Sequence, residues 1–140
     1  MDGPQVDAFT DEGLKTFYNE TYTITTDADR MGYRMDGPEI ARAKPADIVS
    51  DGIVFGAVQV PGHGRPIVMM SDRQTTGGYT KIAVVSTWSA ARLAQKLPNE
   101  TVRFQRVTEH EATGYLERFE NDLRVLDQMR ATYRSRRYWD

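Results

Sequence analysis

A group of polar side chains surrounds two consecutive glycines, Gly77 and Gly78, in the middle of the chain. A carboxylate, a carboxamide, hydroxyls and an ammonium follow one another there: Asp72, Gln74, Thr75, Thr76, Tyr79 and Lys81. Together they offer the donors and acceptors that a small neutral amide, lactam or urea requires. A hydrogen-bonded turn that closes a hairpin uses the same residue types, so both interpretations stay open from spacing alone.

The chemistry expected of this group is amide activation. Asp72 would accept a hydrogen bond from the substrate nitrogen. Threonine hydroxyls, the backbone N–H groups of Gly77 and Gly78, or the ammonium of Lys81 would stabilise negative charge that grows on the carbonyl oxygen. We therefore assign Asp72, Gln74 and Lys81 as candidate catalytic residues.

Two residues outside the glycine pair join the candidate site. Gln59 shares the alternating face of Ile53 and Ala57, so its carboxamide points where its neighbours place apolar groups and needs a partner. Arg30 lies beside Asp29 and near Gly32, where it would hold an anion or, as we favour, pair with an aspartate beside it in the chain. With Gln59 and Arg30, the candidate substrate-binding residues are Thr75, Thr76, Gly77, Gly78 and Tyr79.

Four sequence blocks resemble the allophanate hydrolase subunit 2 family, which includes the 5-oxoprolinase C-subunit, KipA proteins and the carboxyltransferase region of urea carboxylase. The most specific block is DRQTTGGY at residues 72–79, followed by KIA at 81–83. The others are GPQ at 3–5, DRMGYR at 29–34 and GAVQVP at 56–61. Residues 102–107 match the closing strand of the same family, so the resemblance runs from Gly3 to the start of the C-terminal helix.

The resemblance implies a mainly β fold, a cyclophilin-like β-barrel with short helices and a longer C-terminal helix. Family members are longer, and the match is to their second half. Residues 1–140 are therefore expected to form a single domain that corresponds to the C-terminal half of such a protein, and we expect this domain to be inactive in isolation.

The resemblance further implies a subunit of an ATP-dependent amidohydrolase assembly that acts on a small amide or lactam, of the 5-oxoprolinase or allophanate hydrolase type. Its partners would be a subunit 1 protein (KipI-like, the 5-oxoprolinase B-subunit) and the N-terminal half of its own family chain. Two alternatives stay open. One is a KipA-type regulator that binds a KipI-like kinase inhibitor, and the other is the carboxyltransferase domain of a biotin-dependent urea carboxylase.

Composition and motifs also bear on the ligands, partners and location to be expected. The net charge of -2 gives no electrostatic reason to expect nucleic acid or an anionic membrane as a partner. There is no cysteine, and the two histidines, His63 and His110, lie in different elements, so no metal site is expected. No Walker-type phosphate loop occurs, so the place of ATP is not visible in the sequence. The N-terminus lacks an apolar signal segment, and we expect a cytoplasmic protein without a membrane span.

The predicted elements follow apolar periodicity and turn residues. Strands are expected near residues 21–25, 32–35, 53–58, 67–70, 82–85 and 101–107, with residues 75–78 forming a turn between two of them. Helices are expected at 11–19, capped by Thr10, at 87–97 and at 109–137. The last helix carries an apolar stripe that we expect to pack in the core, with a partner-helix surface as the alternative: Ala112, Leu116, Phe119, Leu123, Leu126, Met129 and Tyr133.

Overall fold

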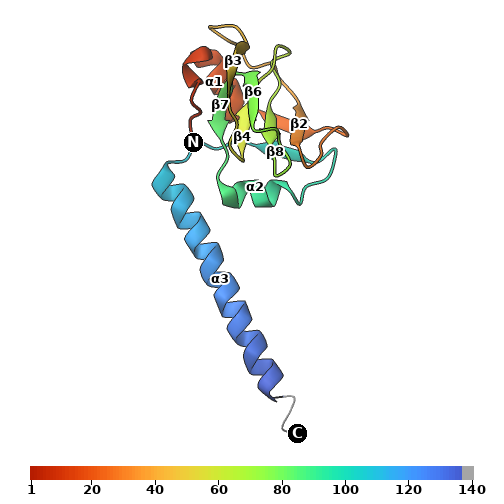
Figure 1. Ribbon diagram of the computed structural model, residues 1–140, viewed down its shortest axis with the longest axis vertical. Helices are drawn as coiled ribbons and strands as arrows, with labels where there is room; N and C mark the ends of the chain where they lie inside the picture. The colour runs from red at the N-terminus through yellow and green to blue at the C-terminus, as the bar shows by residue number, and fades with distance from the viewer. Residues whose placement is uncertain (137–140) are drawn as a thin grey trace. The chain divides into compact units, whose positions relative to one another are not determined.

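The computed structural model describes residues 1–136 of the chain, which form two units (Figure 1). The first unit, Met1–Val107, holds all the strands, and the second begins at Thr108 and contains one long helix. The elements of the first unit are η1 (Val6–Ala8), α1 (Asp11–Asn19), β1 (Thr21–Ile24), β2 (Gly32–Asp36), β3 (Asp47–Gly52), β4 (Ala57–Gln59), β5 (Ile67–Met69), β6 (Thr76–Tyr79), β7 (Lys81–Val84), α2 (Thr87–Leu93) and β8 (Thr101–Arg103).

Six strands form one curled sheet in the order β7-β4-β5-β2-β1-β8, and every neighbouring pair is antiparallel. The N-terminal segment covers the outer edge of β7, where Gly3 N donates to Ile82 O at 2.9 Å. A Cβ at Gly3 would lie 2.3 Å from Lys81 O, so only glycine permits this approach. The mainly β fold expected from the sequence is confirmed, as a half-barrel with short helices.

The core lies inside the curl of the sheet. Val58, Val68 and Ile82 are fully buried there. The ring of Phe17 from α1 stacks on Phe104 with a centroid distance of 4.4 Å. Helix α1 begins as expected, because the hydroxyl of Thr10 accepts a hydrogen bond from Gly13 N at 3.0 Å.

A second, smaller apolar cluster covers the opposite face of β4 and β5 and contains Ile53, Ala57, Ile67 and Met69. Because side chains alternate along a strand, both faces of these two strands are buried. Gln59 is on the face of Ala57, as the sequence predicted, and is only 3% exposed. Its carboxamide therefore lies among these apolar side chains.

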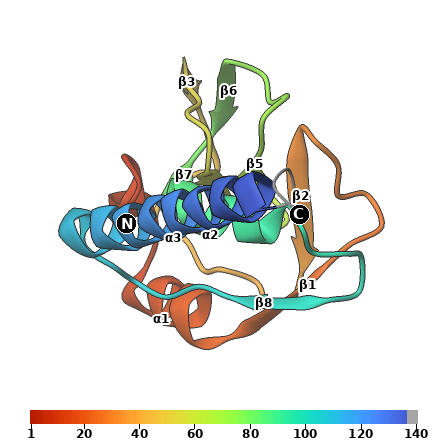
Figure 2. The same cartoon turned by 90° about the horizontal axis from the view of Figure 1, so that it is seen from below.

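The predicted turn at residues 75–78 is wrong, because Thr76–Tyr79 is a strand, β6. It pairs with β3 in a two-stranded ribbon in which Asp51 faces Gly77 and Gly52 faces Thr76. Figure 2 shows β3 and β6 side by side, extending away from the six-stranded sheet. The predicted strand at 53–58 begins only at Ala57, since Gly56 has a φ of +81° and ends a turn that brings the chain back from the ribbon.

The second unit is described by helix α3 (Glu109–Arg136). Thr108 and Glu111 form a capping box at its start. Thr108 N donates to the Glu111 carboxylate at 2.7 Å, and Glu111 N donates to the Thr108 hydroxyl at 3.2 Å. The Thr108 N–H, and then the Thr108 hydroxyl, which donates to the same carboxylate at 2.9 Å, lower the pKa of Glu111.

The expected core packing of the α3 stripe is wrong for its C-terminal part, although Ala112 at its start is buried. Leu123, Leu126 and Met129 are 48%, 60% and 64% exposed. The physical reason is that, in the part of the chain that the structure describes, α3 is the only element of its unit, so no second layer of that unit covers the stripe. Neither α3 nor any other helix within residues 1–136 is long and apolar enough to cross a membrane.

Candidate functional site

Lys81 is the most buried charged residue of the candidate site. It lies at the start of β7, its side chain is 2% exposed, and its Nζ donates to Asp51 Oδ2 on β3 at 3.0 Å. Gln5 completes this group, because its Nε2 donates to Asp51 Oδ2 at 3.2 Å and its Oε1 accepts from Lys81 N at 3.1 Å. The Lys81 ammonium, then the Gly52 N–H and the Gln5 amide, hold the pKa of Asp51 below its ordinary value.

Gln59 is the direct cross-strand neighbour of Lys81. Among the described residues, Gln59 Nε2 has no hydrogen-bond acceptor although it is buried. The ribbon approaches it closely, since a Cβ at Gly77 would lie 3.0 Å from Gln59 Nε2 and 2.7 Å from Ile53 Cδ1. A buried donor without an acceptor costs about 1–3 kcal/mol, so this unpaired carboxamide points to a role in holding a ligand.

The DRQTTGGY block places the carboxamide of Gln74 and the glycine pair next to Gln59. The same Cβ position at Gly77 lies 3.6 Å from Gln74 Nε2, so the carboxamides of Gln59 and Gln74 both lie beside this glycine. Neither Gly77 nor Gly78 has a positive φ. Glycine is favoured at position 77 by the close approach of the ends of the Ile53 and Gln59 side chains, not by backbone conformation.

Asp72 and Arg30 form a separate pair. Arg30 Nε lies 2.9 Å from Asp72 Oδ2, and Arg30 Nη2 donates to Asp72 Oδ1 at 3.2 Å, in a bidentate arrangement. Both side chains are exposed, at 82% and 50%. Arg30 thus pairs with a carboxylate, but its partner is Asp72, 42 positions away, and not an aspartate beside it in the chain. In the described residues the Asp72 side chain hydrogen-bonds Arg30 and not Gln59, Gln74 or Lys81.

The remaining candidates lie along the ribbon. Thr75, Thr76 and Tyr79 are exposed, and Tyr79 is 40% accessible. Thr75 O accepts from Ile53 N at 2.9 Å, which anchors the start of β6. The structure therefore brings together Gln59, Gln74, Gly77 and Lys81, with the exposed ribbon hydroxyls on the same strand pair.

Sequence reasoning missed two members of this group, Asp51 and Gln5. A lone lysine in an apolar strand needs a carboxylate partner, but Asp51 lies 30 positions from Lys81 in the chain and was not among the candidates. Gln5 belongs to the GPQ block, and its distance from Lys81 along the chain concealed the contact. The family resemblance included both GPQ at residues 3–5 and KIA at residues 81–83, but it did not indicate that Gln5 and Lys81 are in contact.

The described residues of the candidate site do not fit a metal ion or a nucleoside triphosphate. Within residues 1–136, no group of three or more His, Cys, Asp or Glu side chains could hold a metal. The one buried ammonium of the site is already paired with Asp51, so it is not available for phosphate. The arrangement can instead bind a neutral polar group through carboxamides and backbone N–H groups.

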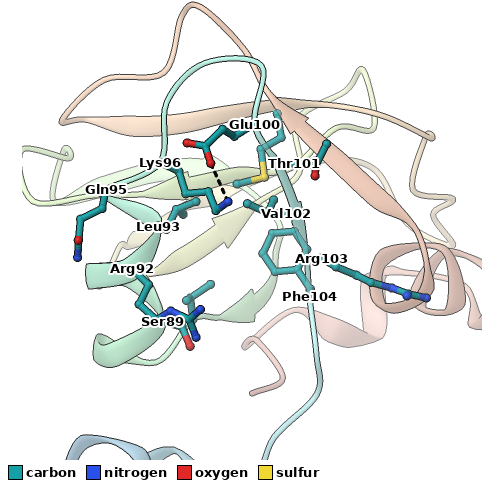
Figure 3. Close-up of a pocket in the computed structure, with 12 residues that line it drawn as sticks. Ser89, Arg92, Leu93, Gln95, Lys96, Glu100, Thr101, Val102, Arg103 and Phe104 are labelled. Carbon is teal, nitrogen blue, oxygen red and sulfur yellow. Dashed lines mark hydrogen bonds and ion pairs between the residues drawn. The ribbon is translucent and has the colours of Figure 1, made fainter. Parts of the chain in front are cut away.

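A hollow lies elsewhere, between α2 and β8 (Figure 3). It encloses about 510 Å³ over a floor that includes Met35, Leu93 and Val102. Lys96 and Glu100 close one side of it with an ion pair of 2.9 Å, and Arg103 extends away from the other side chains drawn. We favour the Gln59 cluster as the functional site, because the hollow offers no buried unpaired polar group among the described residues.

Comparison with known proteins identifies relatives of the whole β unit. The chain is 39% identical over 123 residues to the 5-oxoprolinase C-subunit of Haemophilus influenzae and 34% identical over 112 residues to that of Escherichia coli. These matches cover 88% and 80% of this chain but only 39% and 36% of the relatives, so the chain spans little more than a third of their length.

A solved structure shares the fold. The urea amidolyase of Kluyveromyces lactis superposes with a TM-score of 0.76 at 23% identity, over 81% of this chain and 7% of that protein. The family model described as carboxyltransferase domain, subdomain A and B, matches residues 1–106. Since that match covers the entire curled sheet and both parts of the Gln5–Lys81 contact, the chain belongs to the carboxyltransferase domain, subdomain A and B, family.

Proposed function

We propose that this chain supplies an amide-recognition site to a multi-subunit hydrolase that opens a small amide or lactam, with 5-oxoproline as the leading substrate. The observation that carries the proposal is the buried Gln59 carboxamide, whose Nε2 lacks an acceptor among the described residues beside Gly77. A substrate carbonyl oxygen would provide the missing acceptor. The relatives named as the C-subunit of 5-oxoprolinase support this choice of substrate.

In the proposed reaction, water adds to the amide carbonyl carbon and the C–N bond then breaks, with the proton going to the leaving nitrogen. Gln59 Nε2 would donate to the carbonyl oxygen as negative charge grows on it, and Gln74 would orient the amide from the ribbon side. Lys81 would act through Asp51 and Gln5 as a positioning residue that holds β7 against β3, because its ammonium is already paired.

The rest of the proposed assembly lies outside this chain. We place ATP use on another part of it, since the residues at the Gln59 cluster do not fit a triphosphate. A subunit 1 protein of the KipI-like type, and the portion of the family chain that precedes this one, would complete the site. We propose a cytoplasmic location for this assembly.

A second candidate is carboxyl transfer in a urea carboxylase. The carboxyltransferase family match and the Kluyveromyces lactis neighbours favour it. The same Gln59 donor would then polarise the urea carbonyl. A KipA-type regulatory role is the remaining alternative and would need no turnover at all.

The test is ATP-dependent release of glutamate from 5-oxoproline by the full-length protein with its partner subunits. Gln59→Leu should lower kcat/KM about a hundredfold, the loss typical of one donor to a developing oxyanion. Gln95→Leu is the matched control, because Gln95 is an exposed glutamine whose Nε2 donates to Ala91 O at 3.2 Å.

Equal turnover in Gln59→Leu and the wild type would contradict the proposed site. Absence of lactam turnover with ATP-dependent carboxylation of urea would favour the second candidate. Tight binding of a subunit 1 protein without either activity would favour the regulatory role.

A further inference from the structure

The apolar stripe of α3 has the spacing of a two-helix interface. Leu116 and Leu123 are seven residues apart, and Phe119 and Leu126 repeat the same interval on the adjoining position. Alternating steps of three and four residues place all of them on one seam of a helix, as in a heptad repeat. Gln128 lies on the opposite side of the helix.

The C-terminal part of the seam is exposed. Leu123 and Leu126 are 48% and 60% accessible, and Met129 next to them is 64% accessible. Three neighbouring large apolar side chains on a helix face indicate an interaction surface rather than isolated exposed residues. A partner that covers the seam must also match the charges that flank it.

The two halves of α3 carry net charges of opposite sign. Residues 109–122 contain a single arginine, Arg118, and five carboxylates: Glu109, Glu111, Glu117, Glu120 and Asp122. Residues 123–136 contain a single carboxylate, Asp127, and four arginines: Arg124, Arg130, Arg134 and Arg136.

The helix dipole does not account for all of this asymmetry, because its influence is confined to the first and last turns. Glu117, Glu120 and Arg124 lie well inside the helix. A second copy that runs antiparallel would place the acidic half of each α3 on the basic half of the other. A parallel copy would instead place like charges together.

We propose that α3 is a homodimerisation helix that pairs antiparallel with α3 of a second copy of this chain. In the register that best buries the seam, Leu116 of one copy faces Leu126 of the other, and Phe119 faces Leu123. A two-fold axis between the helices then makes the interface identical on both copies, the usual symmetry of dimers.

The first test is the mass of the 140-residue chain by sedimentation equilibrium. We expect twice 15.9 kDa in the wild type. Leu126→Glu should weaken self-association at least tenfold, whereas Val125→Glu, a change of a neighbouring residue that is 53% exposed off the seam, should leave it within twofold. A monomeric wild type at high micromolar concentration would overturn the proposal.

The second test reads the direction of the helices, and the absence of native cysteine makes it unambiguous. Leu116→Cys and Leu126→Cys should each form little disulfide alone but cross-link efficiently when mixed and oxidised. Gln128→Cys is the control on the opposite side and should not cross-link with either. Efficient cross-linking of each single variant with itself would mean a parallel pair and would contradict the antiparallel arrangement, even if the chain is dimeric.

Discussion

Lys81 and Asp51 form an ion pair with unequal partners, since the ammonium is 2% exposed and the carboxylate, 3.0 Å away, is 50% exposed. The pair joins β7 of the curled sheet to β3 of the ribbon. Lys81 therefore differs from the free catalytic cation expected from the sequence. Its charge is neutralised at the place where the ribbon meets the sheet.

The first prediction concerns the pH dependence of stability. The pKa of Asp51 is lowered in the folded state, chiefly by Lys81, so the carboxylate stabilises the fold above its unfolded pKa of about 3.9. This stabilisation is lost as the pH falls through the lowered folded pKa. Asp51→Asn should thus be less stable than the wild type in urea denaturation at pH 7, and the difference should shrink as the pH falls below about 3.9. A difference that stays constant across this range would contradict the assignment.

The second prediction separates stability from activity at Gln59. Gln59→Leu removes a buried donor that has no acceptor within the described residues, so the free energy of unfolding should stay the same or rise by about 1 kcal/mol. Chemical denaturation of the chain measures this. A loss of more than about 2 kcal/mol would show that the carboxamide has a structural role instead.

The third prediction tests the close approach at Gly77. Gly77→Ala should lower the free energy of unfolding by about 1–3 kcal/mol, because the new methyl group would lie 2.7 Å from Ile53 Cδ1. Gly52→Ala on the partner strand is the control, since a Cβ there meets nothing within 4 Å. Adding Ile53→Val to Gly77→Ala should recover part of the loss. Equal effects at the two glycines would argue against a tightly packed ribbon.

The fourth prediction concerns the exposed Arg30–Asp72 pair. Asp72→Asn and Arg30→Gln should each change the free energy of unfolding by less than about 1 kcal/mol, because both side chains are solvated. Turnover of the intact assembly is the informative measurement. If Asp72 contacts substrate, Asp72→Asn should lower kcat/KM much more than Arg30→Gln, and equal small effects would remove Asp72 from the candidate catalytic residues.

Sequence patterns correctly predicted the helices and strands that depend on a cap or on apolar residues close together in the chain. The Thr10 cap located α1, alternating apolar residues located β1, and a continuous apolar run located β5. The ribbon was not predictable in this way. Its two strands are separated by β4 and β5 in the chain, and glycines at 77 and 78 have the composition of a turn. Their strand conformation depends on pairing with β3, which is a tertiary contact.

In the site, too, a feature that depends on neighbouring residues was predicted, whereas a contact between residues distant in the chain was not. The burial of Gln59 followed from strand alternation and was predicted correctly. The Asp51 partner of Lys81 was missed because the two residues meet only after β3 and β7 come together. The prediction that the α3 stripe packs in the core was wrong for its C-terminal part. The spacing of apolar residues shows which face of a helix needs a partner, but it does not show whether that partner is the core or another molecule.

The contact between Gln5 and Lys81 also has a consequence for the order of folding. These residues are 76 positions apart, and Met1 reaches Val84 over a separation of 83. Contacts of such long sequence separation form slowly, because a large loop must close before they contribute any stability. On a ribosome, the N-terminal segment would have to wait until β7 emerges, so recognition of a ligand should be among the last properties that a newly made chain acquires.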